Sequence, residues 1–126
     1  MDSGINICSL KKILVVDDDT HIQQLLIEEL EEDGYQVSTT SNGKEALALL
    51  VNEFEKPNLV ILDLRMAEMN GLDTIDVILK LQLRFPVIIF SSYSSYRNDP
   101  SAMAADAYVV KSSDLSELKK KVHELV

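Results

Sequence analysis

Apolar runs alternate with amphipathic stretches along most of the chain. Five short runs are rich in aliphatic residues, and most are nearly continuous, as expected for strands that are covered on both faces. These predicted strands are 13–16, 35–40, 59–62, 86–90 and 107–110. The run from 35 to 40 is more polar than the others, which predicts a position at the edge of the sheet. The alternation of strands and helices predicts an α/β fold with a parallel sheet.

The segments between these strands carry apolar residues at helical spacing. The first predicted helix begins near Asp19 and Thr20, pairs Thr20 with Gln23 in a capping box, and stops at Gly34. Further helices are predicted after residues 41–43, after 70–71, from Pro100 to about Ala105, and after Ser113 and Asp114, which would cap the last one.

The chain has 126 residues, of which 46% are hydrophobic and 26% charged. This length and balance predict one globular domain over 11–126, preceded by a tail over 1–10. No apolar run is long enough to span a bilayer, the start lacks a signal-peptide pattern, and the single Cys8 cannot form an internal disulfide. We therefore expect a cytoplasmic location and no membrane contact. The sequence leaves open whether the domain acts alone or begins a longer protein.

Acidic residues outnumber basic ones by 21 to 12, which gives a formal net charge of −9. Phosphate backbones are bound through basic surface, so the charge argues against nucleic acid as a direct partner.

Polar side chains follow four of the predicted strands directly. They are Asp17, Asp18 and Asp19 after the first strand, Asp63 after the third, Ser91 after the fourth and Lys111 after the fifth. Each has a plain alternative, because an aspartate after a strand is often a helix cap and a lone serine or lysine is usually a solvated surface residue. Carboxyl ends of parallel strands share one edge of a sheet, where ligands bind. Taken together, these residues predict a site at that edge.

Crowded carboxylates indicate what this site would bind. Two carboxylates about 4 Å apart repel by roughly 4 kcal/mol at an effective dielectric constant near 20. A cluster of Asp17, Asp18 and Asp63 therefore predicts a compensating cation. Oxygen ligands without nearby His or Cys favour a hard ion, Mg²⁺ first. Such an ion suits a phosphoryl group, to which Lys111 and Ser91 would add charge and hydrogen bonding.

The motifs at these positions resemble those of response-regulator receiver domains. They are Val15-Val16-Asp17-Asp18-Asp19, Leu62-Asp63-Leu64-Arg65-Met66 with Asn70-Gly71, Ser91-Ser92, and Tyr108-Val109-Val110-Lys111. They occur in the family's order, and the likeness covers about residues 11–126. The resemblance implies a flavodoxin-like, doubly wound sheet with strand order 2-1-3-4-5 and helices on both faces.

The resemblance also implies roles for single residues. Asp63 would accept a phosphoryl group, and Lys111 would pair with Asp63 and then with the phosphoryl oxygens. Asp18 would bind Mg²⁺ directly, Asp17 mainly through water, and Arg65 through its backbone carbonyl. As switch residues, Ser91 would bond a phosphoryl oxygen and Tyr108 would turn from exposed to buried. This movement would remodel the surface formed by the helix after Pro100, strand 107–110 and the last helix.

A receiver domain is a switch rather than an enzyme, although it assists its own phosphorylation and dephosphorylation. The implied partners are a histidine kinase or phosphotransfer protein and a downstream protein target, and a phosphorylation-dependent dimer is compatible with the resemblance. Arg65 and Tyr93, each two residues beyond a site residue, are bulky enough to obstruct the hydrolytic water. The plain alternative for both is a solvated surface group.

Three positions depart from the family pattern. Ala67 and Ser112 stand where proline commonly follows Met66 and Lys111, and Ala104 replaces a usual glycine. These changes keep open a second hypothesis, a degenerate receiver that binds partners without being phosphorylated. A phosphatase with an aspartyl intermediate would need Asp-x-Asp-x-Thr, a pattern in which His21 occupies the threonine position. A flavin-binding protein would bring an anionic phosphate to an acid pocket that lacks a phosphate-binding loop.

Overall fold

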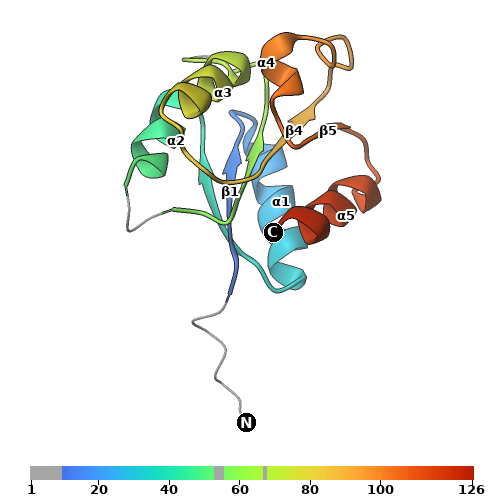
Figure 1. Ribbon diagram of the computed structural model, residues 1–126. Helices are drawn as coiled ribbons and strands as arrows, with labels where there is room; N and C mark the ends of the chain where they lie inside the picture. The colour runs from blue at the N-terminus through green and yellow to red at the C-terminus, as the bar shows by residue number, and fades with distance from the viewer. Residues whose placement is uncertain (1–9, 53–55, 67) are drawn as a thin grey trace.

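The computed structural model describes residues 10–52, 56–66 and 68–126, so most of the predicted tail with Cys8, and also Ala67, lie outside the described residues. Within this part, five parallel strands form one sheet in the order β2-β1-β3-β4-β5, which confirms the predicted topology and the edge position of β2. The strands are β1 (Lys12–Val16), β2 (Gln36–Thr40), β3 (Leu59–Leu62), β4 (Val87–Ser91) and β5 (Ala107–Val110). The helices are α1 (Thr20–Glu32), α2 (Gly43–Leu50), α3 (Gly71–Lys80), α4 (Pro100–Met103) and α5 (Ser116–Leu125) (Figure 1).

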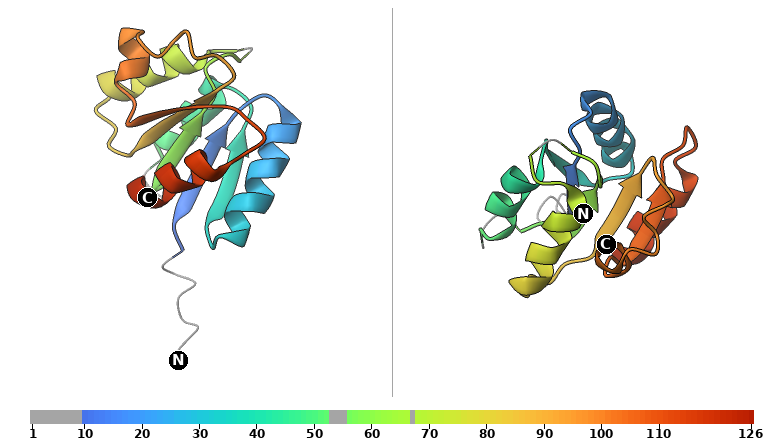
Figure 2. Two further views of the ribbon diagram at one scale, coloured as in Figure 1. Left: turned by 90° about the vertical axis from the view of Figure 1, so that its right-hand side faces the viewer. Right: turned by 90° about the horizontal axis from the view of Figure 1, so that it is seen from above.

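The sheet is the middle of three layers, because alternate side chains of each strand point to opposite faces. One face packs against α1 and α5 through Leu26, Leu30, Leu118 and Val122. The other packs against α2, α3 and α4 through Ala46, Leu50, Ile75, Ile78 and Ala102. Figure 2 shows the helices on both sides of the sheet. All four residues of β3 are buried, as expected for a central strand.

The turns at the carboxyl edge of the sheet are fixed by short polar side chains. Asn42 caps α2 by accepting the Glu45 N–H at 2.9 Å, and Asn70 caps α3 by accepting the Asp73 N–H at 3.0 Å. Gly34 ends α1 with a φ of 96°, a backbone conformation that glycine adopts without steric cost. The predicted stop at this glycine is therefore confirmed.

Three predicted helix ends differ in detail. Asp19 alone caps α1, accepting the His21 N–H at 2.9 Å, so the predicted Thr20–Gln23 capping box is wrong. The last helix begins at Ser116 without a side-chain cap on its first turn, and Asp114 instead binds the Ser116 N–H in the preceding turn. Helix α4 is only four residues long, since Ala104 already closes it.

The two described departures from the family pattern are accommodated without unusual backbone. Ala104 has a φ of −77°, where alanine is unstrained, so a glycine is not needed there. All peptide bonds among the described residues are trans, including the one before Ser112.

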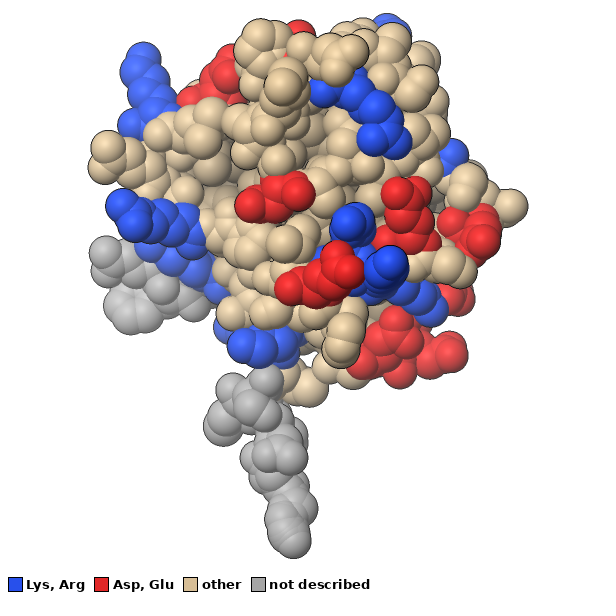
Figure 3. All heavy atoms as spheres, turned by 45° about the vertical axis from the view of Figure 1, so that its right-hand side comes forward, with Lys and Arg blue, Asp and Glu red and all other residues tan. Residues whose placement is uncertain are grey.

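On the face shown in Figure 3, basic and acidic side chains are interspersed and form no field of one sign. An ion pair joins the two helices of one layer: Lys119 on α5 lies 2.9 Å from Glu29 and 3.6 Å from Asp33, at the carboxyl end of α1. No helix within the described residues is both long and apolar enough to cross a membrane.

Candidate functional site

Three carboxylates from two neighbouring strands meet at the carboxyl edge of the sheet. Asp17 and Asp18 follow β1, and Asp63 follows β3, whose last residue pairs with Val16. One carboxylate oxygen from each lies within 4.8 Å of the others, a spacing that could hold a metal ion. Asp17 and Asp63 are buried, whereas Asp18 is exposed. The predicted acid cluster is therefore present, with one side open to solvent.

Lys111 supplies a positive charge inside this cluster. It follows β5, two strands away from β3, and its side chain reaches back across the sheet edge. Its Nζ lies 2.8 Å from Oδ2 of Asp17 and 3.6 Å from Oδ1 of Asp63. The sequence-based prediction paired Lys111 with Asp63, but the shorter contact is with Asp17. The ammonium thus sits between the two buried carboxylates.

The surroundings of Asp63 raise its pKa. Desolvation, and secondarily the charge of Asp17, raises the pKa of Asp63 from 3.8 to about 6, although Lys111 acts in the opposite direction. At neutral pH the group is therefore ionised at a free-energy cost. A bound cation would remove much of this cost, because it stabilises the charged form.

Ser91 and Tyr108 connect the site to the loop that follows β4. Ser91 is fully buried, and its hydroxyl oxygen accepts the Tyr93 N–H at 3.1 Å. The hydroxyl of Tyr108 donates to the carbonyl of Tyr93. Tyr108 is half-buried, whereas the family resemblance implies an exposed starting position.

The loop after Asp63 is held by two glycines. A Cβ on Gly71 would overlap the carbonyl oxygen of Asp63, and the Gly71 N–H donates to Leu64 at 2.9 Å. A Cβ on Gly43 would approach the carbonyl oxygen of Met69 to 2.6 Å, and the Gly43 N–H donates to that oxygen at 3.1 Å. The start of α2 and the start of α3 therefore both press against this loop.

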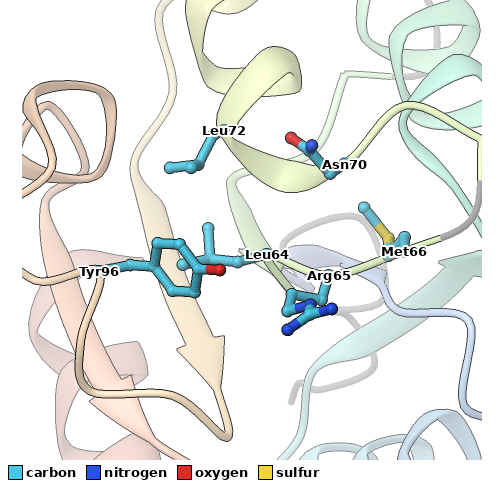
Figure 4. A pocket seen from close by; sticks show the side chains of 6 residues that line it. All are labelled: Leu64, Arg65, Met66, Asn70, Leu72 and Tyr96. Atoms are coloured by element: carbon cyan, nitrogen blue, oxygen red, sulfur yellow. The ribbon is translucent and has the colours of Figure 1, made fainter.

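Arginines lie over aromatic rings beside the site. The guanidinium carbon of Arg65 is 5.0 Å from the centre of the Tyr93 ring, and that of Arg97 is 4.9 Å from the centre of the Tyr108 ring. Between the loops after β3 and β4 lies a hollow of about 560 Å³. Its lining residues are Leu64, Arg65, Met66, Asn70, Leu72 and Tyr96 (Figure 4).

Sequence reasoning missed two residues near the site. Gln23 was assigned to the cap of α1, yet its side-chain amide donates to the carbonyl of Asp17. Arg97 was not singled out, although it is the one arginine in the Ser- and Tyr-rich stretch after β4 and an arginine near aromatic residues is a signal for stacking. The contribution of the Arg65 backbone carbonyl remains a prediction.

Acids and a lysine at the carboxyl edge of a doubly wound α/β sheet are suited to handling a phosphoryl group. The chain belongs to the response regulator receiver domain family, whose model matches residues 13–123.

Solved structures and curated relatives agree with this assignment. The response regulator TrrA of Thermotoga maritima, solved in complex with Mg²⁺ and BeF, is 46% identical with a TM-score of 0.85, and the match covers 93% of this chain and 100% of that one. A second structure, of the histidine kinase ThkA in complex with TrrA, contains a chain that is 45% identical with a TM-score of 0.84. The match covers 93% of this chain and 99% of that one. The regulatory protein PhoP of Bacillus subtilis is 33% identical over 118 residues, which are 92% of this chain and 48% of PhoP. The chain thus spans about half the length of the curated relatives that it matches first.

Proposed function

We propose that Asp63 accepts a phosphoryl group from a phosphohistidine of a partner protein, with Mg²⁺ as the cofactor. The observation that supports this most strongly is the buried Asp63 carboxylate, which lies beside two further carboxylates and the Lys111 ammonium. A related protein, TrrA, was solved with Mg²⁺ and BeF, a mimic of this kind of complex. In the transfer, the bond between phosphorus and the histidine nitrogen breaks, and a bond to a carboxylate oxygen of Asp63 forms.

The residues present fit a magnesium ion. The three carboxylates offer oxygen atoms alone, and they form the ligand type that Mg²⁺ prefers. Asp18 and Asp63, with the Arg65 carbonyl, would hold the ion directly, and Asp17 would act mainly through water. When bound, Mg²⁺ would neutralise charge on the phosphoryl oxygens.

Lys111 has two successive tasks in this proposal. Without a cation, its ammonium partly neutralises Asp17 and Asp63, at 2.8 and 3.6 Å. With a cation beside these carboxylates, Lys111 is released to bind a phosphoryl oxygen. The Ser91 hydroxyl at the end of β4 would bind another and draw its loop inward.

The response would appear on the surface of α4, β5 and α5. Tyr108 on β5 is bonded to Tyr93, two residues after Ser91, so a movement of Ser91 reaches Tyr108 through two hydrogen bonds. This surface would bind a downstream protein target or, in a phosphorylation-dependent dimer, a second copy of the chain.

A histidine kinase, or a phosphotransfer protein, is the proposed phosphodonor. Support comes from TrrA, whose complex with the histidine kinase ThkA involves a protein 45% identical to this chain. A cytoplasmic location for this domain is proposed from its sequence, which has one cysteine and an acidic, globular composition.

The first test is phosphorylation of the whole domain with acetyl phosphate and Mg²⁺. Intact mass spectrometry is expected to show one added phosphoryl group on the wild type and none on Asp63→Asn, because the amide cannot accept it. Asp73→Asn, at an exposed acid in the first turn of α3, is the control and should be phosphorylated like the wild type. Phosphorylation of Asp63→Asn would disprove the assignment.

The domain is also proposed to assist its own dephosphorylation, at a rate limited by Arg65 and Tyr93. The stacking of the Arg65 guanidinium on the Tyr93 ring brings the two bulky groups together, and they lie two residues beyond Asp63 and Ser91. Replacing both with alanine should shorten the phosphoryl half-life severalfold, as measured by the decay of the phosphorylated mass. Arg84→Ala, at an exposed arginine before β4, is the control. An unchanged half-life in the double variant would exclude obstruction by these side chains.

A further inference from the structure

Gln23 makes contacts that its place in the sequence does not predict. It lies in the first turn of α1 and is half-buried. Asp19 already accepts the backbone N–H of His21 and caps the helix, so the amide of Gln23 is not needed there. Its side chain instead leaves the helix and reaches the carboxyl edge of the sheet.

The Gln23 amide nitrogen joins the ends of two strands. Its Nε2 donates to the carbonyl of Asp17 at 2.5 Å, and lies 3.2 Å from the Ser41 hydroxyl and 3.5 Å from the Thr40 carbonyl. The Thr40 carbonyl also accepts the Asp17 N–H at 3.1 Å. An amide group has two hydrogens, and the shortest of its three contacts is the one to Asp17.

This arrangement holds Asp17 on both sides. The peptide group before Asp17 is held through its N–H by Thr40, and the peptide group after it is held through its carbonyl by Gln23. Because a peptide group is planar, fixing the Asp17 carbonyl also fixes the N–H and Cα of Asp18. The direction in which the exposed Asp18 carboxylate leaves the backbone therefore depends on Gln23.

We propose that Gln23 is a positioning residue for the cation site, which acts by orienting the peptide group between Asp17 and Asp18. The inference rests on the proposed function, in which Asp18 binds Mg²⁺ directly. Groups that orient the ligands of a metal commonly contribute ten- to hundredfold to its affinity. Only a hydrogen-bond donor of this length can serve, because the group that it holds is a carbonyl.

The test compares two neighbouring glutamines on the same helix. Gln23→Met keeps the length of the side chain and removes its donor, and Gln24→Met makes the same change at an exposed residue whose amide contacts Glu28 on α1. Titration calorimetry with Mg²⁺ is expected to show a dissociation constant about tenfold higher for Gln23→Met and unchanged within twofold for Gln24→Met. Equal affinities in Gln23→Met and the wild type would overturn the proposal, as would equal losses in both variants.

A second measurement separates positioning from general stability. In the metal-free domain, the backbone amide signal of Asp18 in NMR spectra should shift in Gln23→Met and stay in place in Gln24→Met. A purely structural role would lower the free energy of unfolding without changing the affinity of the folded domain for Mg²⁺. Gln23→Asn, which retains the amide but is one carbon too short, should reproduce the loss of affinity if the methionine variant does not fold.

The two proposals fail in different ways. If the wild type does not bind Mg²⁺, the proposed function is wrong. The positioning role then fails with it, because there is no cation site to orient. If the wild type binds Mg²⁺ and Gln23→Met binds it equally tightly, the positioning role alone is wrong.

Discussion

The two loops that flank the site are held in different ways. In the loop from β3 to α3, the described residues 63–66 and 68–70 are held through their backbone: Gly71 donates to Leu64, and Gly43 donates to Met69. In the loop from β4 to α4, residues 92–99, backbone bonds run within the loop, from Arg97 to Ser94 and from Asp99 to Tyr96.

Side chains connect the second loop to its surroundings. They are the bond from Tyr108 to Tyr93, the stacking of Arg65 on Tyr93 and of Arg97 on Tyr108, and, just after the loop, the bond from Ser101 to Asp76 at 2.7 Å. A hollow of about 560 Å³ separates the two loops over part of their length.

This difference matches two separate needs of a switch. Groups that bind an ion must keep their geometry, and close backbone packing maintains it. A segment that reports the state of the site must move at low cost, and side-chain contacts near the surface can be exchanged. On the proposed function, the loop after β3 would hold the groups that bind the ion, and the loop after β4 would carry the response.

The largest effect on stability is expected from crowding the loop after β3. Gly71→Ala would place a methyl group on the carbonyl of Asp63, and we expect a loss of about 3 kcal/mol in the free energy of unfolding. Gly34→Ala is the control, since its Cβ would meet no atom within 4 Å and only the φ of 96° costs about 1 kcal/mol. Urea denaturation measures both, and equal losses would show that the loop is not tightly packed.

A somewhat smaller effect is expected from pH. The pKa of Asp63 rises on folding, so its stabilising contribution is complete below about pH 3.8 and is lost as the pH rises through about 6. The metal-free domain should therefore become more stable between pH 7 and pH 4, by at most about 3 kcal/mol. Below that range the lowered pKa values of Asp19 and Asp114, which come from hydrogen bonds, act in the opposite direction.

The variant Asp63→Asn and added Mg²⁺ isolate this contribution. Each should flatten the rise in unfolding free energy between pH 7 and pH 4, the first by removing the titrating group and the second by stabilising its charged form. A rise of the same size in Asp63→Asn would assign the titration to another residue.

The smallest effect is expected in the loop after β4. Tyr108→Phe removes the hydrogen bond to Tyr93 but keeps the ring under Arg97, so we expect a loss of about 1 kcal/mol. Changes in the amide chemical shifts between Tyr108→Phe and the wild type should be concentrated in residues 92–99. Tyr35→Phe, at the amino end of β2, is the control. Shifts that were as large around Gly71 would contradict the separation of the two loops.

Much of the site could be predicted because it depends on topology. Parallel strands bring their carboxyl ends to one edge, so Asp17, Asp63 and Lys111 had to lie close once the strands were recognised. Their exact pairing was not predictable: the sequence places Lys111 after β5 but does not decide which of two carboxylates is closer.

Errors arose where a local pattern competed with a distant contact. Thr20 and Gln23 have the spacing of a capping box, yet Asp19 takes the cap and the Gln23 amide binds Asp17. The close approach of Gly43 to Met69 involves residues 26 positions apart in the chain and has no local signature. Such contacts are decided by how the helices pack, which periodicity does not specify.

The formal charges of the three carboxylates and Lys111 indicate which ion would neutralise the site. Three ionised carboxylates against the single ammonium of Lys111 leave two negative charges, and one divalent ion would cancel them. A monovalent ion would cancel only one of the two negative charges, and a trivalent ion would leave one positive charge. With the ion in place, a phosphoryl group that is then attached would meet a nearly neutral surrounding, so its arrival would be felt chiefly through the hydrogen bonds that its oxygens accept from Ser91 and Lys111.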